Sequence, residues 1–103
     1  MSAPRKRRLR VALTDSEAMH AAHPETWDHP DAAELAALGP GWAIKVLAGQ
    51  ERFWVRVTSR DGNRLRGLVD NALVDAAHIG VDLGDEIECE TRHVLDVWRL
   101  PDA

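Results

Sequence analysis

Cysteine is almost absent from this chain of 103 residues, which contains only Cys89. A single cysteine cannot form an internal disulfide, and it supplies none of the paired spacings that crosslink small secreted domains. We therefore expect a protein of a reducing compartment and place it in the cytoplasm.

Long apolar runs are absent as well. No stretch approaches the roughly 20 residues of a membrane span, and no apolar segment of about 7 to 15 residues follows the basic start, as it would in a signal peptide. The seven glycines never gather into a loop that opens a helix, which excludes a phosphate-binding loop. The chain has no internal repeat, and its length fits one domain around one core.

Charge is distributed unevenly along the chain. Five of the 13 lysines and arginines lie in residues 1–10, which contain no acidic residue. The other eight basic residues and all 17 acidic residues lie in the rest of the chain, which therefore carries a net charge of −9. Blocks of like charge are usually solvated tails, and an acidic body repels phosphate. We predict a mobile arm over 1–10 that is dispensable for folding. The alternative is a nucleic-acid-associated accessory protein, binding through Arg5, Lys6, Arg7, Arg8 and Arg10.

Two short helices are predicted before Pro40. Thr14 and Glu17 have the spacing of a capping box, which indicates a helix over about 15 to 22 with Thr14 as its N-cap. Asp31 is the expected cap of a second helix, Ala32 to Leu38.

From Trp42 onward, apolar residues recur at every second position, which is the period of a strand. The alternation is clearest over 52–58, and Asp61-Gly62-Asn63 then supplies the residues of a tight hairpin turn. Further strands are predicted over 64–70, 86–91 and 96–100, with a connecting loop over 71–83 and a tight turn over 92–95.

These strands predict a mainly β fold with short N-terminal helices, of the α+β class. About five short antiparallel strands, with a helical turn before the last, can close into a small SH3-like barrel. The predicted divisions are a basic arm (1–10), a helical and loop segment packing on the barrel (11–41) and the barrel itself (42–103). Strand parity predicts one core, formed by Ile44, Val46, Phe53, Val55, Val57, Leu65, Val69 and Ile87.

Four short motifs between Pro40 and Trp98 carry a resemblance to a known family. They are Phe53-Trp54-Val55-Arg56-Val57, Asp61-Gly62, Gly67-Leu68-Val69-Asp70-Asn71 and Gly84-Asp85-Glu86-Ile87. In these motifs the chain resembles the YegJ-like bacterial domains of unknown function. The resemblance implies no activity, because that family has no assigned reaction.

Three histidines, His20, His23 and His29, fall within ten residues, and imidazole is a common ligand of transition metals. Only His20 and His23 can share a helix face, since His29 lies beyond a proline. The spacing therefore favours unliganded side chains, and no metal or cofactor is predicted.

Cys89 and His93 are four residues apart and suggest a thiol nucleophile beside a base. Strand parity instead puts Cys89 on the inward face with Ile87, where a free cysteine packs as a small apolar side chain. We predict no catalytic residue.

The outward face of the central hairpin carries Trp54 between Arg52 and Arg56. Two interpretations stay open: the N-terminal helices cover this indole, or it belongs to a binding surface, where tryptophan and arginine are enriched. The leading hypothesis is a non-enzymatic module that binds a protein or a small ligand. Its candidate contacts are Trp54, Arg56, Arg66 and Asn71.

Overall fold

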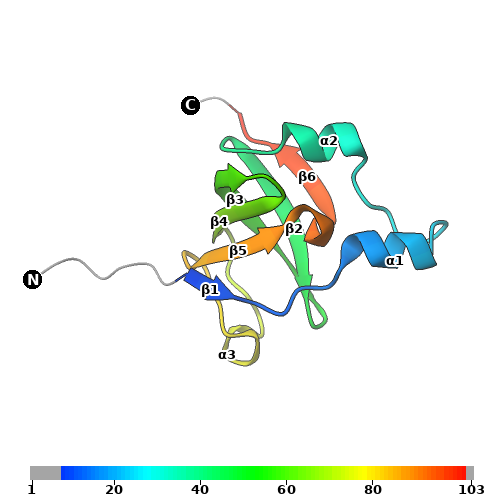
Figure 1. The fold of residues 1–103 in the computed structure, drawn as a ribbon. Helices are drawn as coiled ribbons and strands as arrows, with labels where there is room; N and C mark the ends of the chain where they lie inside the picture. Colours follow the sequence, from blue (N-terminus) through cyan, green and yellow to red (C-terminus); the bar gives the residue numbers. More distant parts are fainter. Residues whose placement is uncertain (1–7, 102–103) are drawn as a thin grey trace, which may run out of the picture.

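The computed structural model describes the backbone of residues 8–101 and the side chains from Val11 onward. Its centre is one sheet with the strand order β1-β5-β4-β3-β2-β6 (Figure 1). The strands are β1 (Arg8–Arg10), β2 (Trp42–Ala48), β3 (Glu51–Asp61), β4 (Arg64–Val69), β5 (Glu86–Glu90) and β6 (Asp96–Arg99). The helices are α1 (Ser16–Ala22), α2 (Ala32–Ala37), α3 (Ala76–Ile79) and the 3-10 turn η1 (Thr91–His93).

The five strands β2 to β6 pair antiparallel, which confirms the predicted mainly β fold with a few short helices. β3 and β4 are joined by Gly62 and Asn63, and the φ of +60° at Gly62 is the left-handed conformation that such a turn requires. Within the described residues the sheet is not closed into a barrel, because β6 pairs with β2 alone while the outer edge of β5 pairs with β1.

β1 corrects one part of the prediction, since Arg8–Arg10 belong to the sheet rather than to an unstructured arm. This strand runs parallel to β5, with Arg8 opposite Glu86 and Arg10 opposite Glu88. The physical reason is that β5 would otherwise leave the backbone groups of its outer edge unpaired, and β1 pairs with them. The remainder of the predicted arm, residues 1–7, lies outside the described residues.

Both N-terminal helices form where they were predicted, but the cap of the first one differs. Asp15, not Thr14, is the N-cap of α1, and its Oδ1 accepts a hydrogen bond from the Ala18 N–H at 2.9 Å. Thr14 instead donates its N–H to the carbonyl of Leu47 at 2.8 Å, which ties it to β2. Asp31 caps α2 as predicted, in a reciprocal capping box with Glu34.

The hydrophobic core confirms the predicted strand register, because all eight residues expected in it are buried. Parity alone missed the core side chains that come from loops and turns: Leu38, Leu73, Val81 and Val94. The N-terminal segment packs on the same core through Val11, Leu13 and Leu35. In the described part of the chain, no helix is long and apolar enough to span a bilayer.

Gly67 lies where β3 and β4 leave no room for a side chain on β4. It pairs with Val57, next to a register shift between Val57 and Ser59. A Cβ atom built on Gly67 would meet the carbonyl oxygen of Arg56 and would lie 2.6 Å from Cγ1 of Val55. Only glycine therefore fits here, and the bulge in the pairing lies on the partner strand β3.

Candidate functional site

An open cleft lies on the outer face of the sheet, where β2, β3 and β6 are neighbours. It has a volume of about 320 Å³ and is lined by Ala43, Trp54, Asp70, Trp98 and Leu100. Four of the five lining residues are apolar or aromatic, and Asp70 is the one charged residue of the lining. All five lining residues lie on strands or directly beside them, so Trp54 faces this cleft rather than the N-terminal helices.

The strand register explains how the two tryptophans come together. Trp98 lies opposite Ala43, and Trp54 lies opposite Lys45, two residues further along β2 on the same face. Ala43 also lines the cleft, and its small side chain leaves space beside Trp98. Trp98 is 61% exposed, whereas Trp54 is half-buried.

Hydrogen bonds of the strand ends hold Trp54 in place. Its backbone N–H donates to Oδ1 of Asn71 at 2.7 Å, and its carbonyl accepts the Asp70 N–H at 2.9 Å. The Asn71 side chain thus continues the β3–β4 pairing beyond the last residue of β4. Its visible role is to position Trp54 and Asp70.

The two arginines singled out from the sequence lie apart. Arg56 Nη2 is 3.9 Å from Oδ2 of Asp70, at the rim of the cleft. Arg66 lies opposite Ser59 because of the register shift, and its Nε bonds Oε1 of Glu88 at 3.1 Å. The structure therefore brings Trp54, Arg56 and Asn71 to one place and directs Arg66 toward β5.

Trp98 is the main cleft residue that the sequence analysis missed. It occupies a short terminal strand whose pairing with β2, and not with its neighbour in sequence β5, places the indole in the same cleft as Trp54. The signal that was available is the alternation of Asp96, Trp98 and Leu100 on one face of the predicted edge strand.

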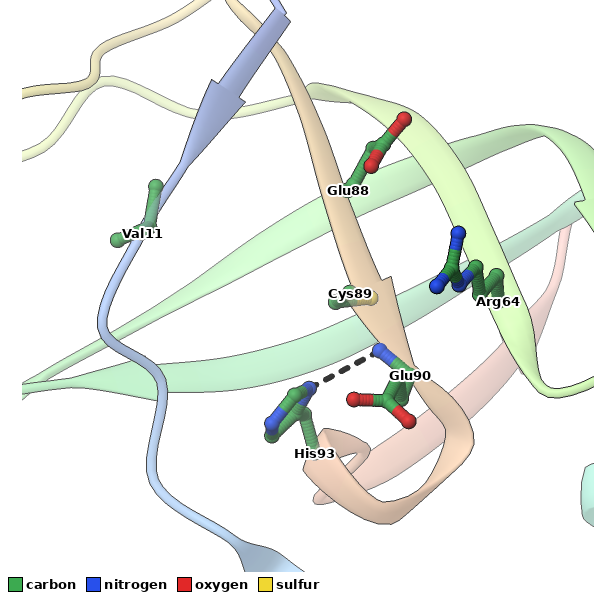
Figure 2. Close-up of a pocket in the computed structure, with 6 residues that line it drawn as sticks. All are labelled: Val11, Arg64, Glu88, Cys89, Glu90 and His93. Carbon is green, nitrogen blue, oxygen red and sulfur yellow. Dashed lines mark hydrogen bonds between the residues drawn. The ribbon is translucent and has the colours of Figure 1, made fainter.

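A second, smaller pocket of about 190 Å³ contains the cysteine and histidine considered as a catalytic pair (Figure 2). It lies at the edge of β5 and is lined by Val11, Arg64, Glu88, Cys89, Glu90 and His93. Figure 2 shows the His93 ring turned to the backbone of β5, where Nδ1 accepts the Glu90 N–H at 2.9 Å. The neutral ring therefore carries its hydrogen on Nε2.

Neither partner of this pair is activated. Burial, with a smaller contribution from the adjacent Glu90 carboxylate, raises the pKa of the Cys89 thiol to about 12. Burial lowers the pKa of His93, with a smaller contribution from the Arg92 guanidinium. At neutral pH the site holds a protonated thiol and a neutral imidazole, which is the state of a packed cysteine rather than of a nucleophile.

The histidines of the N-terminal segment take part in a buried hydrogen-bond cluster. Ser16 is fully buried, and its Oγ accepts from Nε1 of Trp27 at 3.1 Å and lies 2.9 Å from Nδ1 of His29. The same Nδ1 is 3.0 Å from the Val94 carbonyl, and because a carbonyl only accepts, Nδ1 must carry the hydrogen of the neutral ring. His20 Nδ1 bonds the Trp27 carbonyl. The cluster links α1 to the end of η1.

Within residues 8–101, no group of three or more His, Cys, Asp or Glu residues is arranged to hold a metal ion. Of the five arm residues in the nucleic-acid alternative, Arg8 and Arg10 belong to β1, while Arg5, Lys6 and Arg7 lie outside the described residues. No protein-family model, curated protein or solved structure matches this chain. The resemblance to the YegJ-like domains stays a prediction.

Proposed function

We propose that this protein is a non-enzymatic interaction module that binds a partner protein through the cleft between Trp54 and Trp98. The observation that carries this proposal is the exposure of Trp98, at 61%, in a cleft that a second indole also lines. Large aromatic side chains are enriched at the centres of protein interfaces, and exposing two of them in one cleft costs solvation free energy that a partner would recover.

The strand order supports an SH3-like arrangement for this module. The strands β2 to β6 are ordered β6-β2-β3-β4-β5, and a 3-10 turn precedes β6, as in the small barrel expected from the sequence. In this arrangement the first and last strands of the unit, β2 and β6, are paired with each other. They bring their outward residues, Ala43 and Trp98, into a common surface.

Two observations favour the cleft over the other functions considered. The raised pKa of Cys89 leaves the most obvious nucleophile protonated. The chain beyond residue 10 carries a net charge of −9, which repels the phosphate backbone of a nucleic acid.

A peptide-display selection against the full chain tests the proposal. Peptides enriched on the wild-type protein are expected to lose binding to Trp98→Ala and to keep it with Leu83→Ala. Leu83 is a matched control because it is 60% exposed and lies outside the cleft. Peptides that bind Trp98→Ala as well as the wild type, or a selection without enrichment, would overturn the proposal.

A salt titration separates the cleft from the nucleic-acid alternative. Binding of single-stranded DNA through about five basic residues should weaken steeply as salt rises, whereas binding in an apolar cleft should change little. Tight, strongly salt-dependent DNA binding that survives Trp98→Ala would favour the arm.

A further inference from the structure

The charges around the cleft indicate what kind of side chain it accepts. Asp70 lines the cleft, and Asp96 lies two positions before Trp98 on the same face of β6. Two basic residues adjoin them, since Asp96 lies opposite Lys45 and Asp70 lies near Arg56. The chain beyond residue 10 carries a net charge of −9, counted from its eight basic and 17 acidic residues. A cationic partner would be attracted to this body at long range, and an anionic one would be repelled.

The indoles of this molecule already bind cations from its own side chains. Lys45 Nζ lies 5.0 Å from the centroid of the Trp54 ring, and Cζ of Arg99 lies 6.0 Å from that of Trp42. Both distances are those of a cation–π contact. The exposed indole of Trp98 offers the same kind of ring surface, next to a carboxylate, to a cation from outside.

The carboxylate of Asp70 is available to such a cation. Its ion pair with Arg56 is long, at 3.9 Å, and the two side chains are 55% and 39% exposed, so solvent screens the pair. Exposed pairs of this kind contribute about 0 to 1 kcal/mol, so an incoming cation can replace Arg56 at little cost.

We infer that the cleft binds an arginine side chain of an extended partner peptide, with the guanidinium against Trp98 and paired with Asp70. This inference rests on the proposed function and specifies its ligand. Arginine fits better than lysine because its planar guanidinium stacks on an indole and pairs with a carboxylate through two N–H groups at once.

The test uses four synthetic peptides of the form acetyl-Gly-Ser-Ala-X-Ala-Ser-Gly-amide, in which X is Arg, Lys, Gln or Glu. The four indole N–H signals of the full-length protein are followed by ¹H–¹⁵N NMR during titration. The arginine peptide is expected to shift the signals of Trp54 and Trp98 and to leave those of Trp27 and Trp42, which serve as internal controls. The lysine peptide should bind more weakly, and the glutamine and glutamate peptides should cause no shift.

Variants add a second readout. Asp70→Asn should weaken binding of the arginine peptide about three- to five-fold, because it removes one partner of an exposed charge pair. Asp61→Asn, an exposed acid at the far end of β3, should bind as the wild type does. Thermal unfolding of both variants shows whether the fold is intact.

Several results would overturn the inference. An arginine site would be contradicted if the glutamine peptide shifted the indole signals as much as the arginine peptide does, or if the glutamate peptide shifted them more. It would also be contradicted if the signals of all four indoles shifted equally. If an oligothymidylate shifts the Trp54 and Trp98 signals more than the arginine peptide does, the cleft binds nucleic-acid bases by stacking and not an arginine side chain. If no peptide shifts the two indoles, the arginine site is wrong. The proposed function is then still decided by the display selection, which is unbiased in sequence.

Discussion

Lys45 and Trp54 are register partners on β2 and β3, and the lysine ammonium lies 5.0 Å from the centroid of the indole ring. The contact helps to hold a large aromatic side chain in place on the outer face of the sheet, while Trp54 also lines the cleft. A cation–π contact at a partly exposed site contributes about 0.5 to 1 kcal/mol, which limits the freedom of the ring without covering it. The cleft therefore has one wall positioned before any partner arrives.

Replacing Gly67 by alanine should destabilise the protein. The added Cβ would meet the Arg56 carbonyl and Cγ1 of Val55, so β3 and β4 would have to separate. Overpacking of this kind costs about 1 to 3 kcal/mol. Urea unfolding measures the loss, and Gly39→Ala is the matched control because a Cβ there has no atom within 4 Å. Equal stability of the two variants would contradict the close β3–β4 approach.

Ser16→Ala should also reduce the free energy of unfolding, by about 1 to 3 kcal/mol, because it removes the buried oxygen that Trp27 Nε1 bonds. The NMR signal of the Trp27 indole N–H should shift in this variant, since that N–H loses its acceptor. Ser59→Ala changes an exposed hydroxyl and serves as the control. An unchanged Trp27 signal in Ser16→Ala would show that the buried cluster does not form.

Most of the fold follows from local sequence signals, and the cleft does not. Strand parity predicted the buried face from Ile44 to Ile87, and Asp31 marked the start of α2. These features depend on residues close together in the chain. Trp54 and Trp98 line one cleft because β6 pairs with β2, and the paired residues are more than 50 positions apart in the sequence. No local pattern specifies that pairing.

The two departures near the N-terminus have a similar origin. A basic segment considered alone has the composition of a solvated tail, and its pairing with the backbone of β5, far along the chain, makes part of it a strand. Thr14 and Asp15 are both good capping residues, and the hydrogen bond of Thr14 to Leu47 on β2 decides which of them caps α1. In both cases a distant segment decides between local options.

His93 should make stability depend on pH. Burial lowers its pKa in the folded protein, so as the pH falls the unfolded chain takes up this proton first. The contribution of His93 to stability is complete above the unfolded value of about 6.5 and is lost as the pH falls from there toward the folded pKa.

His93→Asn tests this dependence, because the Asn side-chain oxygen can accept the Glu90 N–H while the titrating ring is removed. Between about pH 7 and pH 5, the unfolding free energy of the wild type should fall more steeply than that of the variant. Identical slopes for the two proteins would mean that His93 titrates alike in both states.

Cys89 should behave as an inert, packed thiol. With a pKa of about 12, almost none of it is thiolate at neutral pH, and the side chain is only 6% exposed. Iodoacetamide should therefore modify it slowly in the native protein and rapidly in urea, as followed by mass spectrometry. Rapid native modification would contradict the non-enzymatic account and would make Cys89→Ser the next variant to assay.

The most direct test of the central claim is the solvent exposure of the four indoles, measured by NMR line broadening with a soluble nitroxide, with and without the strongest peptide from the display selection. In the free protein the Trp98 N–H should broaden most and that of Trp27, bonded to Ser16, least. The peptide should protect Trp98 and Trp54 and leave Trp27 and Trp42 unchanged. A free protein in which Trp98 is as protected as Trp27, or a complex in which Trp98 stays fully exposed, would contradict the cleft as the binding site.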